Sequence, residues 1–230
     1  MYFFRCLLFV GVAASPASAA TITNGGFDDG LNGHTVEAVA AAVPATELAT
    51  VATAPSGNTY LSLEARPQTG GFGVSASQML TIDASAPILS FDAALLSEEQ
   101  VLAGLPANLD DTFSASITPD GGGSTTILFQ FDNGLAPAGN FTSFTDAPES
   151  VFGPSLGAFS VIADLSAFSG QSVSLSFSGF NFETVLTQSF FGVDNIALSA
   201  LDDSVSEVPL PLSAGLLLTG LFAFGTLRRR

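Results

Sequence analysis

Few residues of this 230-residue chain have side chains of the types that enzymes use for catalysis. His34 is the only histidine, and it follows a glycine-rich turn, where a solvated imidazole is expected instead of a general base. Glu98 and Glu99 are adjacent, so their carboxylates point apart, whereas a retaining glycosidase needs two carboxylates about 5 Å apart that face one substrate. A hydrolase with its active site in the 97–111 loop is the remaining alternative. We expect no catalytic residues and no enzymatic activity.

Thiol and amine chemistry is limited in the same way, because the chain has one cysteine, Cys6, and no lysine. Cys6 lies in a segment typical of a secretory signal peptide, with one charge at Arg5, a short apolar run and a small-x-small cleavage site at 17–19. Signal peptidase would remove residues 1–19, leaving a mature chain without thiols or disulfides. We therefore expect an exported protein that is held together by its core alone.

The charge of the exported part is strongly one-sided. All 21 acidic residues lie between Asp28 and Glu207 and Arg66 is the only basic residue among them, so this part has a net charge of −20. Such a surface repels nucleic acid, and no nucleic-acid partner is expected. Arg66 is expected to pair with a neighbouring acid, and adjacent acids such as Asp110 and Asp111 to be solvated at the ends of loops.

Alternation of apolar and polar residues recurs from residue 59 onward and predicts strands with one buried face. In residues 171–178, Val173, Leu175 and Phe177 would point to one side and the intervening serines to the other. The other strands are expected at 60–64, 72–82, 89–95, 113–117, 127–131, 159–165 and 191–198. With glycine-rich turns between them, they predict an all-β fold, an antiparallel β-sandwich of jelly-roll type, over residues 20–203.

Three stretches depart from this alternation. Apolar residues change face within 191–198, which predicts a bulge near Asp194 and Asn195. The alanine-rich segment 38–54 shows no clear period, and 97–111 is expected to be a long loop with one helical turn at 98–102.

The C-terminal region 204–230 contains twenty uncharged residues, 208–227, before a basic tail, 228–230. A helix of that length, at about 1.5 Å per residue, would just cross a hydrocarbon core of about 30 Å. If Pro209 and Pro211 delay the start of the helix to Leu212, the remaining sixteen residues make a marginal anchor. The arginines orient the tail toward the cytoplasm. We expect a C-terminal transmembrane helix.

This region also resembles a sorting signal. The resemblance is carried by Val208, Pro209, Leu210 and Pro211 before the apolar run and by Arg228, Arg229 and Arg230 after it. Together they resemble the VPLPA variant of the PEP-CTERM sorting domain, except that Leu212 stands where the family motif usually has alanine. The resemblance implies that the protein is an exosortase substrate of a Gram-negative bacterium. It would first be anchored in the inner membrane as an intermediate and then reach the cell surface or extracellular matrix. An ordinary tail anchor that is never cut is the alternative.

The two ends of the predicted sandwich resemble those of galactose-binding-like jelly rolls. The similar segments are 24–28, with the sequence NGGFD, and 190–196, with the sequence FFGVDNI. The resemblance implies a structural calcium bound by Asp28 and Asp194, with Asn24 and backbone carbonyls as further oxygen ligands. Without a metal, Asp28 would be a turn former and Asp194 a hydrogen-bonded residue at the end of a strand.

The functional expectation combines these features. A structural or adhesive role in exopolysaccharide or biofilm is expected, and a calcium-stabilised carbohydrate-binding module is the alternative. The alternative needs exposed aromatic rings such as Phe141 and Phe144, because the chain has no tryptophan and Tyr60 is the only tyrosine after signal cleavage.

The sorting signal predicts a change in mass. In a host that contains an exosortase, we expect the recovered protein to lack residues 1–19 and the residues after the Pro-x-Pro stretch. A variant with Pro209→Ala and Pro211→Ala serves as the control and should keep its tail. Intact-mass spectrometry of protein from membranes and medium measures both, and a wild-type mass that still includes Arg230 would identify an ordinary anchor.

Overall fold

The computed structural model describes residues 21–39, 44–66, 72–96, 111–132, 137–155, 157–181 and 189–200. The expected signal peptide, the C-terminal region 204–230 and the helical turn at 98–102 lie outside these residues. Within the described residues, no helix has the length and apolar character needed to cross a membrane.

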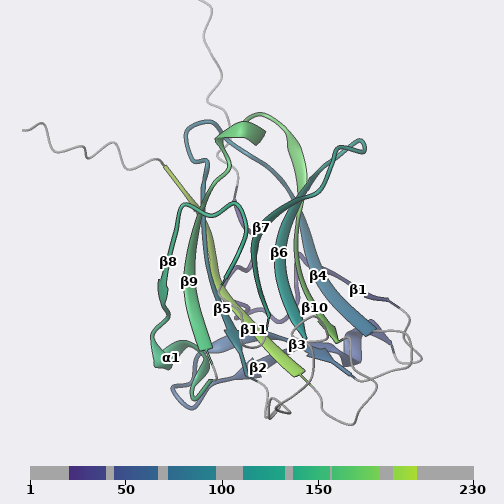
Figure 1. Cartoon of the computed structure of the whole chain (residues 1–230), viewed down its shortest axis with the longest axis vertical. Coiled ribbons are helices and arrows are strands. Elements are labelled where there is room, and N and C mark those ends of the chain that lie inside the picture. Colours follow the sequence, from purple (N-terminus) through teal and green to yellow (C-terminus); the bar gives the residue numbers. More distant parts are fainter. Residues whose placement is uncertain are drawn as a thin grey trace, which may run out of the picture. The chain divides into compact units, whose positions relative to one another are not determined.

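The described residues form eleven strands in two antiparallel sheets (Figure 1). Sheet A has the order β1-β4-β10-β6-β7, and sheet B has the order β2-β3-β11-β5-β9-β8. The strands are β1 (Thr35–Val39), β2 (Ala49–Thr53), β3 (Thr59–Ala65), β4 (Phe72–Thr81), β5 (Ile88–Leu95), β6 (Thr112–Pro119), β7 (Thr126–Asp132), β8 (Ser143–Asp146), β9 (Gly157–Asp164), β10 (Ser172–Asn181) and β11 (Ser189–Ser199). The chain is thus an antiparallel β-sandwich of jelly-roll type, and all eight strands expected from alternation are present.

Three strands were not expected from the sequence, and all three lie at the edges of the sheets. β1 is short and its described apolar side chains are only partly buried, β2 lies within the alanine-rich segment, and all four residues of β8 are exposed, so none of them has a fully buried face. Short helices complete the described chain: α1 (Glu149–Phe152) and the 3-10 turns Ala45–Glu47 and Ser166–Phe168. Edge strands make ladder bonds on one side only, so their pairing leaves a weaker signal in the sequence.

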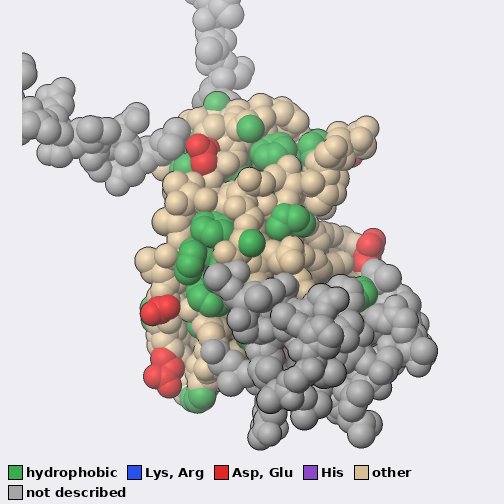
Figure 2. Space-filling model, in the orientation of Figure 1, with side chains coloured by type: hydrophobic (Ala, Val, Ile, Leu, Met, Phe, Trp, Pro, Cys, Tyr) green, Lys and Arg blue, Asp and Glu red, His purple; other side chains and the backbone are tan. Residues whose placement is uncertain are grey.

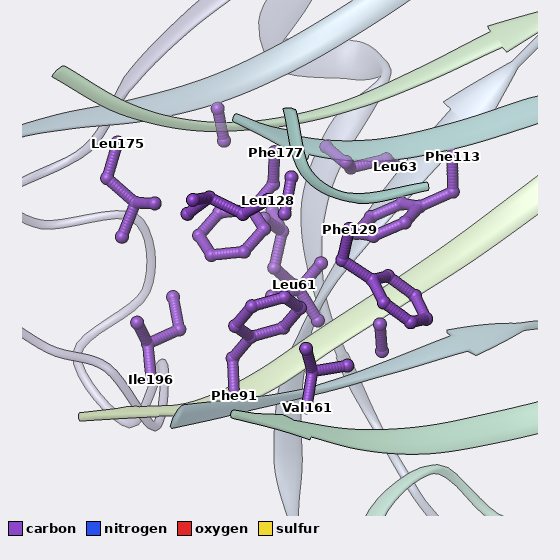
Figure 3. Packing of buried hydrophobic residues seen from close by; sticks show 14 of the residues in the cluster. Leu61, Leu63, Phe91, Phe113, Leu128, Phe129, Val161, Leu175, Phe177 and Ile196 are labelled. Carbon is purple, nitrogen blue, oxygen red and sulfur yellow. The ribbon is translucent and has the colours of Figure 1, made fainter. Parts of the chain in front are cut away.

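The core lies between the two sheets, and its largest fully buried side chains are phenylalanines (Figure 3). In β10, Val173, Leu175 and Phe177 are buried, as the alternation predicted. The Phe177 ring packs edge to face on Phe91 of sheet B, with ring centroids 5.2 Å apart. Aromatic pairs of this kind contribute about 0.5–1.5 kcal/mol beyond the area they bury. Phe177 therefore links the two sheets.

The outer faces of the two sheets differ. On sheet B, Val151 and Phe152 of α1 pack against Ala94 and cover part of the outer face. Gly192 makes this approach possible, since a Cβ there would lie 2.7 Å from the Phe152 ring. On sheet A, the outward residues of β10 are serines and Phe180, none of which is fully buried. One outer face is thus partly covered, and the other presents hydroxyl groups.

Truncation of the central ring should test this core. We expect Phe177→Ala to lower the free energy of unfolding by about 3–5 kcal/mol, because it leaves a cavity where the sheets meet. Met79→Ala is the control, since Met79 is 55% exposed and its truncation should change stability by less than about 0.5 kcal/mol. Denaturant unfolding measures both variants, and equal losses would contradict the assigned core.

Candidate functional site

A bulge in β11 creates the first candidate site. Asp194 lies opposite Asp92 of β5, and the regular pairing resumes only at Ala197. Asn195 has a left-handed backbone with φ of 52°. The irregularity expected near Asp194 and Asn195 is thus confirmed. It frees the Ile196 amide from the ladder, and this amide donates to the Gly25 carbonyl at 3.0 Å.

The N-terminal loop reaches this bulge because residue 25 is glycine. A Cβ at Gly25 would lie 2.0 Å from the Ile196 carbonyl oxygen, so no larger residue fits. The buried Gln78 of β4 holds the same loop from the other side. Its Nε2 donates to the carbonyls of Thr23 and Gly33 at 3.0 and 3.1 Å, and its Oε1 accepts from the Thr23 amide at 3.1 Å. These contacts fix the loop that carries Asp28.

Asp194 is completely buried and only partly satisfied. Its Oδ2 accepts from Asn58 Nδ2 at 2.7 Å, while its Oδ1 has no hydrogen-bond partner. Burial raises the pKa of Asp194, and the negative charges of Asp92 and Asp28 raise it further, against the lowering effect of the bonds from Asn58 and Asn195. A buried, unpaired carboxylate oxygen is costly and suggests a missing partner.

Asp28 and Asn24 lie in the neighbouring loop. The Thr59 hydroxyl is 2.9 Å from Asp28 Oδ1 and 3.1 Å from the Gly26 carbonyl. The Asn24 amide closes the loop, because its Nδ2 donates to the Gly30 carbonyl at 2.8 Å and its Oδ1 accepts from the Asp29 amide at 3.0 Å. Asp28 thus bonds Thr59, the residue after the Asn58 that bonds Asp194, and Asn24 shapes the loop.

We call Asp28, Asp92 and Asp194 the carboxylate centre. Asp92 was not expected to be a site residue. Its side chain points outward from β5, and the alternation of the sequence predicts that such a side chain is solvated. Asp92 is buried and accepts hydrogen bonds from the Ser160 hydroxyl and, at 2.7 Å, from Asn195 Nδ2. Its carboxylate is therefore already bonded and positions the bulge.

The carboxylate centre fits a hard cation in one respect. The unpaired Asp194 Oδ1 and the neighbouring Asp28 offer negative oxygens of the kind that calcium prefers. Across the described residues, however, no three His, Cys, Asp or Glu side chains are grouped closely enough to hold a metal. Further ligands would therefore be backbone or amide oxygens. The assignment of calcium to Asp28, Asp194 and Asn24 stays a prediction.

Two other polar residues differ from expectation. Asp111 was expected to be a solvated loop end, which is wrong: it is 1% exposed and contacts the Ser189 hydroxyl and, at 3.2 Å, the Asn181 amide. His34 is half-buried and not fully solvated, because its ring lies 5.0 Å from that of Phe27, and burial lowers the pKa of its imidazole. Asp111 is covered by segments distant in sequence, which local pattern does not reveal, whereas the ring beside His34 comes from the same N-terminal loop.

Arg66 behaves as expected. Its Nε donates to Glu64 Oε1 at 2.6 Å and its second guanidinium nitrogen to Oε2 at 3.0 Å. Arg66 is the only lysine or arginine between residues 20 and 207, so this bidentate pair occupies the one such cation of that part of the sequence.

The second candidate site is a groove of about 490 Å³ on the outer face of sheet A. It crosses β4, β10, β6 and β7, and we call it the hydroxyl groove. The polar side chains that line it are Ser75, Thr112, Ser114, Gln130, Ser176 and Ser178. Among the described side chains that line the groove, Phe180 contributes the one aromatic ring and none is acidic or basic. Such a surface offers hydrogen bonds without charge.

The aromatic pair proposed for sugar stacking lies elsewhere, at the side of the sandwich where β7 and β8 approach. Phe144 is 40% exposed, and its ring lies 5.3 Å from Phe141, which is partly buried. Both rings also contact Phe129 of the core. They are therefore partly engaged in closing the open side of the core.

Comparisons with known proteins concern the fold. No protein-family model and no curated protein matches the chain. TmCBM61, solved with β-1,4-galactotriose, is 12% identical, with 80% of this chain and 100% of that chain covered and a TM-score of 0.47. CBM28, a module specific for non-crystalline cellulose, is 12% identical, with 80% and 97% covered and a TM-score of 0.46. A Stig cyclase from Fischerella sp. TAU is 16% identical, with 80% and 98% covered and a TM-score of 0.44. These likenesses support no statement about function.

The buried carboxylate predicts a pH and calcium dependence. The pKa of Asp194 in the folded state lies above the ordinary 3.8. Its contribution to the free energy of unfolding is therefore fully present below pH 3.8 and is lost as the pH rises through the folded-state pKa. Without calcium, Asp194→Asn should therefore gain stability over wild type as the pH rises through this range.

The same variant tests the metal. If calcium binds the carboxylate centre, it should raise the thermal midpoint of wild type but not of Asp194→Asn. Asp120→Asn removes an acid from an exposed turn and should respond to calcium as wild type does. Melting scans with calcium and with chelator measure both effects, and an unchanged wild-type midpoint would exclude the site.

Proposed function

We propose that this chain is an exported adhesive protein that holds polysaccharide in the hydroxyl groove, without catalysing a reaction. One observation carries the proposal: four adjacent strands of sheet A present serine, threonine and glutamine side chains around one aromatic ring. Sugars bind through hydroxyl groups that donate and accept hydrogen bonds and through apolar ring faces that stack on aromatic side chains. The groove offers both kinds of contact.

Glycine brings the aromatic ring of the groove onto the sheet. Phe180 lies opposite Gly73 in the β10–β4 ladder, and a Cβ at residue 73 would lie 2.7 Å from the Phe180 ring. The ring therefore covers the backbone of β4 where another residue would displace it. A flat ring in this position would support the apolar face of a sugar.

The proposed route of the protein out of the cytoplasm rests on the motifs of its N-terminal and C-terminal segments. We propose that signal peptidase removes residues 1–19, that the C-terminal helix anchors an inner-membrane intermediate, and that an exosortase then sorts the chain to the cell surface or extracellular matrix. The VPLPA-like motif and the arginine tail support this route. Exopolysaccharide would then be the partner of the groove, in keeping with a structural or adhesive role in biofilm.

Calcium would stabilise the fold and would not take part in glycan binding in the groove. We propose that Asp28 and Asp194 hold a structural calcium that joins the N-terminal loop to β11, with Asn24 in the same loop. The unpaired Asp194 Oδ1 supports this role. Asp194 pairs with β5 of sheet B, whereas the lining of the groove belongs to sheet A, so loss of the metal should affect stability more than binding.

Affinity electrophoresis in gels that contain galactan, mannan or amorphous cellulose tests the groove. We expect at least one of these glycans to retard the wild-type protein, and Phe180→Ala to weaken retardation by up to about tenfold, the loss of one stacking contact. Phe144→Ala is the matched control on the β7–β8 side and should be retarded like wild type. Loss of retardation in Phe144→Ala alone would place the binding surface at the Phe141–Phe144 pair, and absence of retardation in every glycan would contradict the proposal.

A further inference from the structure

We infer that the ligand of the hydroxyl groove is an uncharged, extended glycan chain that crosses the strands of sheet A, with one strand beside each sugar residue. This inference rests on the proposed function and names the class of ligand and its direction.

The direction follows from the register of the sheet. Ser75 of β4 lies opposite Ser178 of β10, Ser178 lies opposite Ser114 of β6, and Ser114 lies opposite Gln130 of β7. Cross-strand partners share one face of a sheet, and all four residues line the groove. They form a straight polar row, perpendicular to the strands, with one side chain from each strand.

The spacing of this row suits an extended polysaccharide. Neighbouring strands lie about 4.8 Å apart, so the row from Ser75 to Gln130 covers three intervals, or about 14 Å. A sugar residue in an extended β-1,4-linked chain advances the chain by nearly one such interval. A glycan chain laid across the strands would therefore meet one polar side chain at each sugar residue. A glycan chain laid along one strand would not, because outward side chains along a strand are spaced differently from the sugar residues.

The hydroxyls can serve either hydrogen-bond direction. Ser114 Oγ and Ser178 Oγ lie 3.0 Å apart, and either can be the donor. Each serine hydroxyl has one donor and two acceptor positions, and the Gln130 amide both donates and accepts. The row can thus pair with sugar hydroxyls, which also donate and accept.

Charge limits the class of glycan. None of the described side chains that line the groove is charged, and Glu37, the exposed partner of Ser75 on β1, adds a negative charge beside one end of the row. Figure 2 shows acidic side chains and no basic ones on the face that it presents. The only cation of the exported part, Arg66, is paired with Glu64. Uronate and sulfated chains would therefore be repelled with no compensating contact.

Calorimetric titration of the exported protein with β-1,4-linked oligosaccharides of increasing length tests the inference. We expect affinity to rise with each residue up to about four, one for each strand of the row, and then to level off. A polyuronate should not bind at low ionic strength, where repulsion is least screened. Gln130→Ala removes the last member of the row and should lower affinity by about fivefold and shorten the plateau by one residue.

The matched control is Gln171→Ala, since Gln171 is exposed and lies outside the groove, where it bonds the Ala167 carbonyl. Its affinities should equal those of wild type. Binding without dependence on length, equal binding of the polyuronate, or an effect of Gln171→Ala equal to that of Gln130→Ala would overturn the inference while leaving glycan binding intact. If no glycan binds at all, the proposed function itself fails, and this inference with it.

Discussion

The packing of phenylalanine rings between the two sheets is the interaction on which the rest of the structure depends. The chain has a single cysteine, so no disulfide within it can join the sheets, and the core must do so alone. Across the sandwich, the ring centroids of Phe177 and Phe91 lie 5.2 Å apart, and those of Phe113 and Phe191 lie 5.9 Å apart. This packing fixes the position of β10 and β6, whose outer sides form the hydroxyl groove.

In each long strand of sheet A, one side of the strand packs in the core and the other side is available to bind a ligand. Inward residues of sheet A fill the core, so its outward residues are free to be serine, threonine or glutamine without loss of packing. Sheet B uses its outer side differently, because α1 covers part of it and the buried Asp92 and Asp194 lie on that side. One sheet would therefore carry the ligand surface, and the other carries the bulge that binds the N-terminal loop.

The features that depend on residues close together in the sequence could be predicted from it. The strands with clean alternation were found at their expected places, and the bulge in β11 was visible as a change of parity near Asp194. The edge strands β1, β2 and β8 were missed because they lack a fully buried face. Asp92 and Asp111 were missed because segments distant in sequence bury them, and no local pattern records that burial.

The amino-acid sequence by itself determined which side of each long strand enters the core, and also the one-sided charge, because the first depends on residues adjacent in the chain and the second on composition alone. The tertiary structure alone decided which outward side chains become neighbours. Ser75, Ser114, Gln130 and Ser178 form one row only after four strands pair in a particular register. That register results from the packing of the whole core, since a slip of one residue would turn the apolar side of a strand toward water.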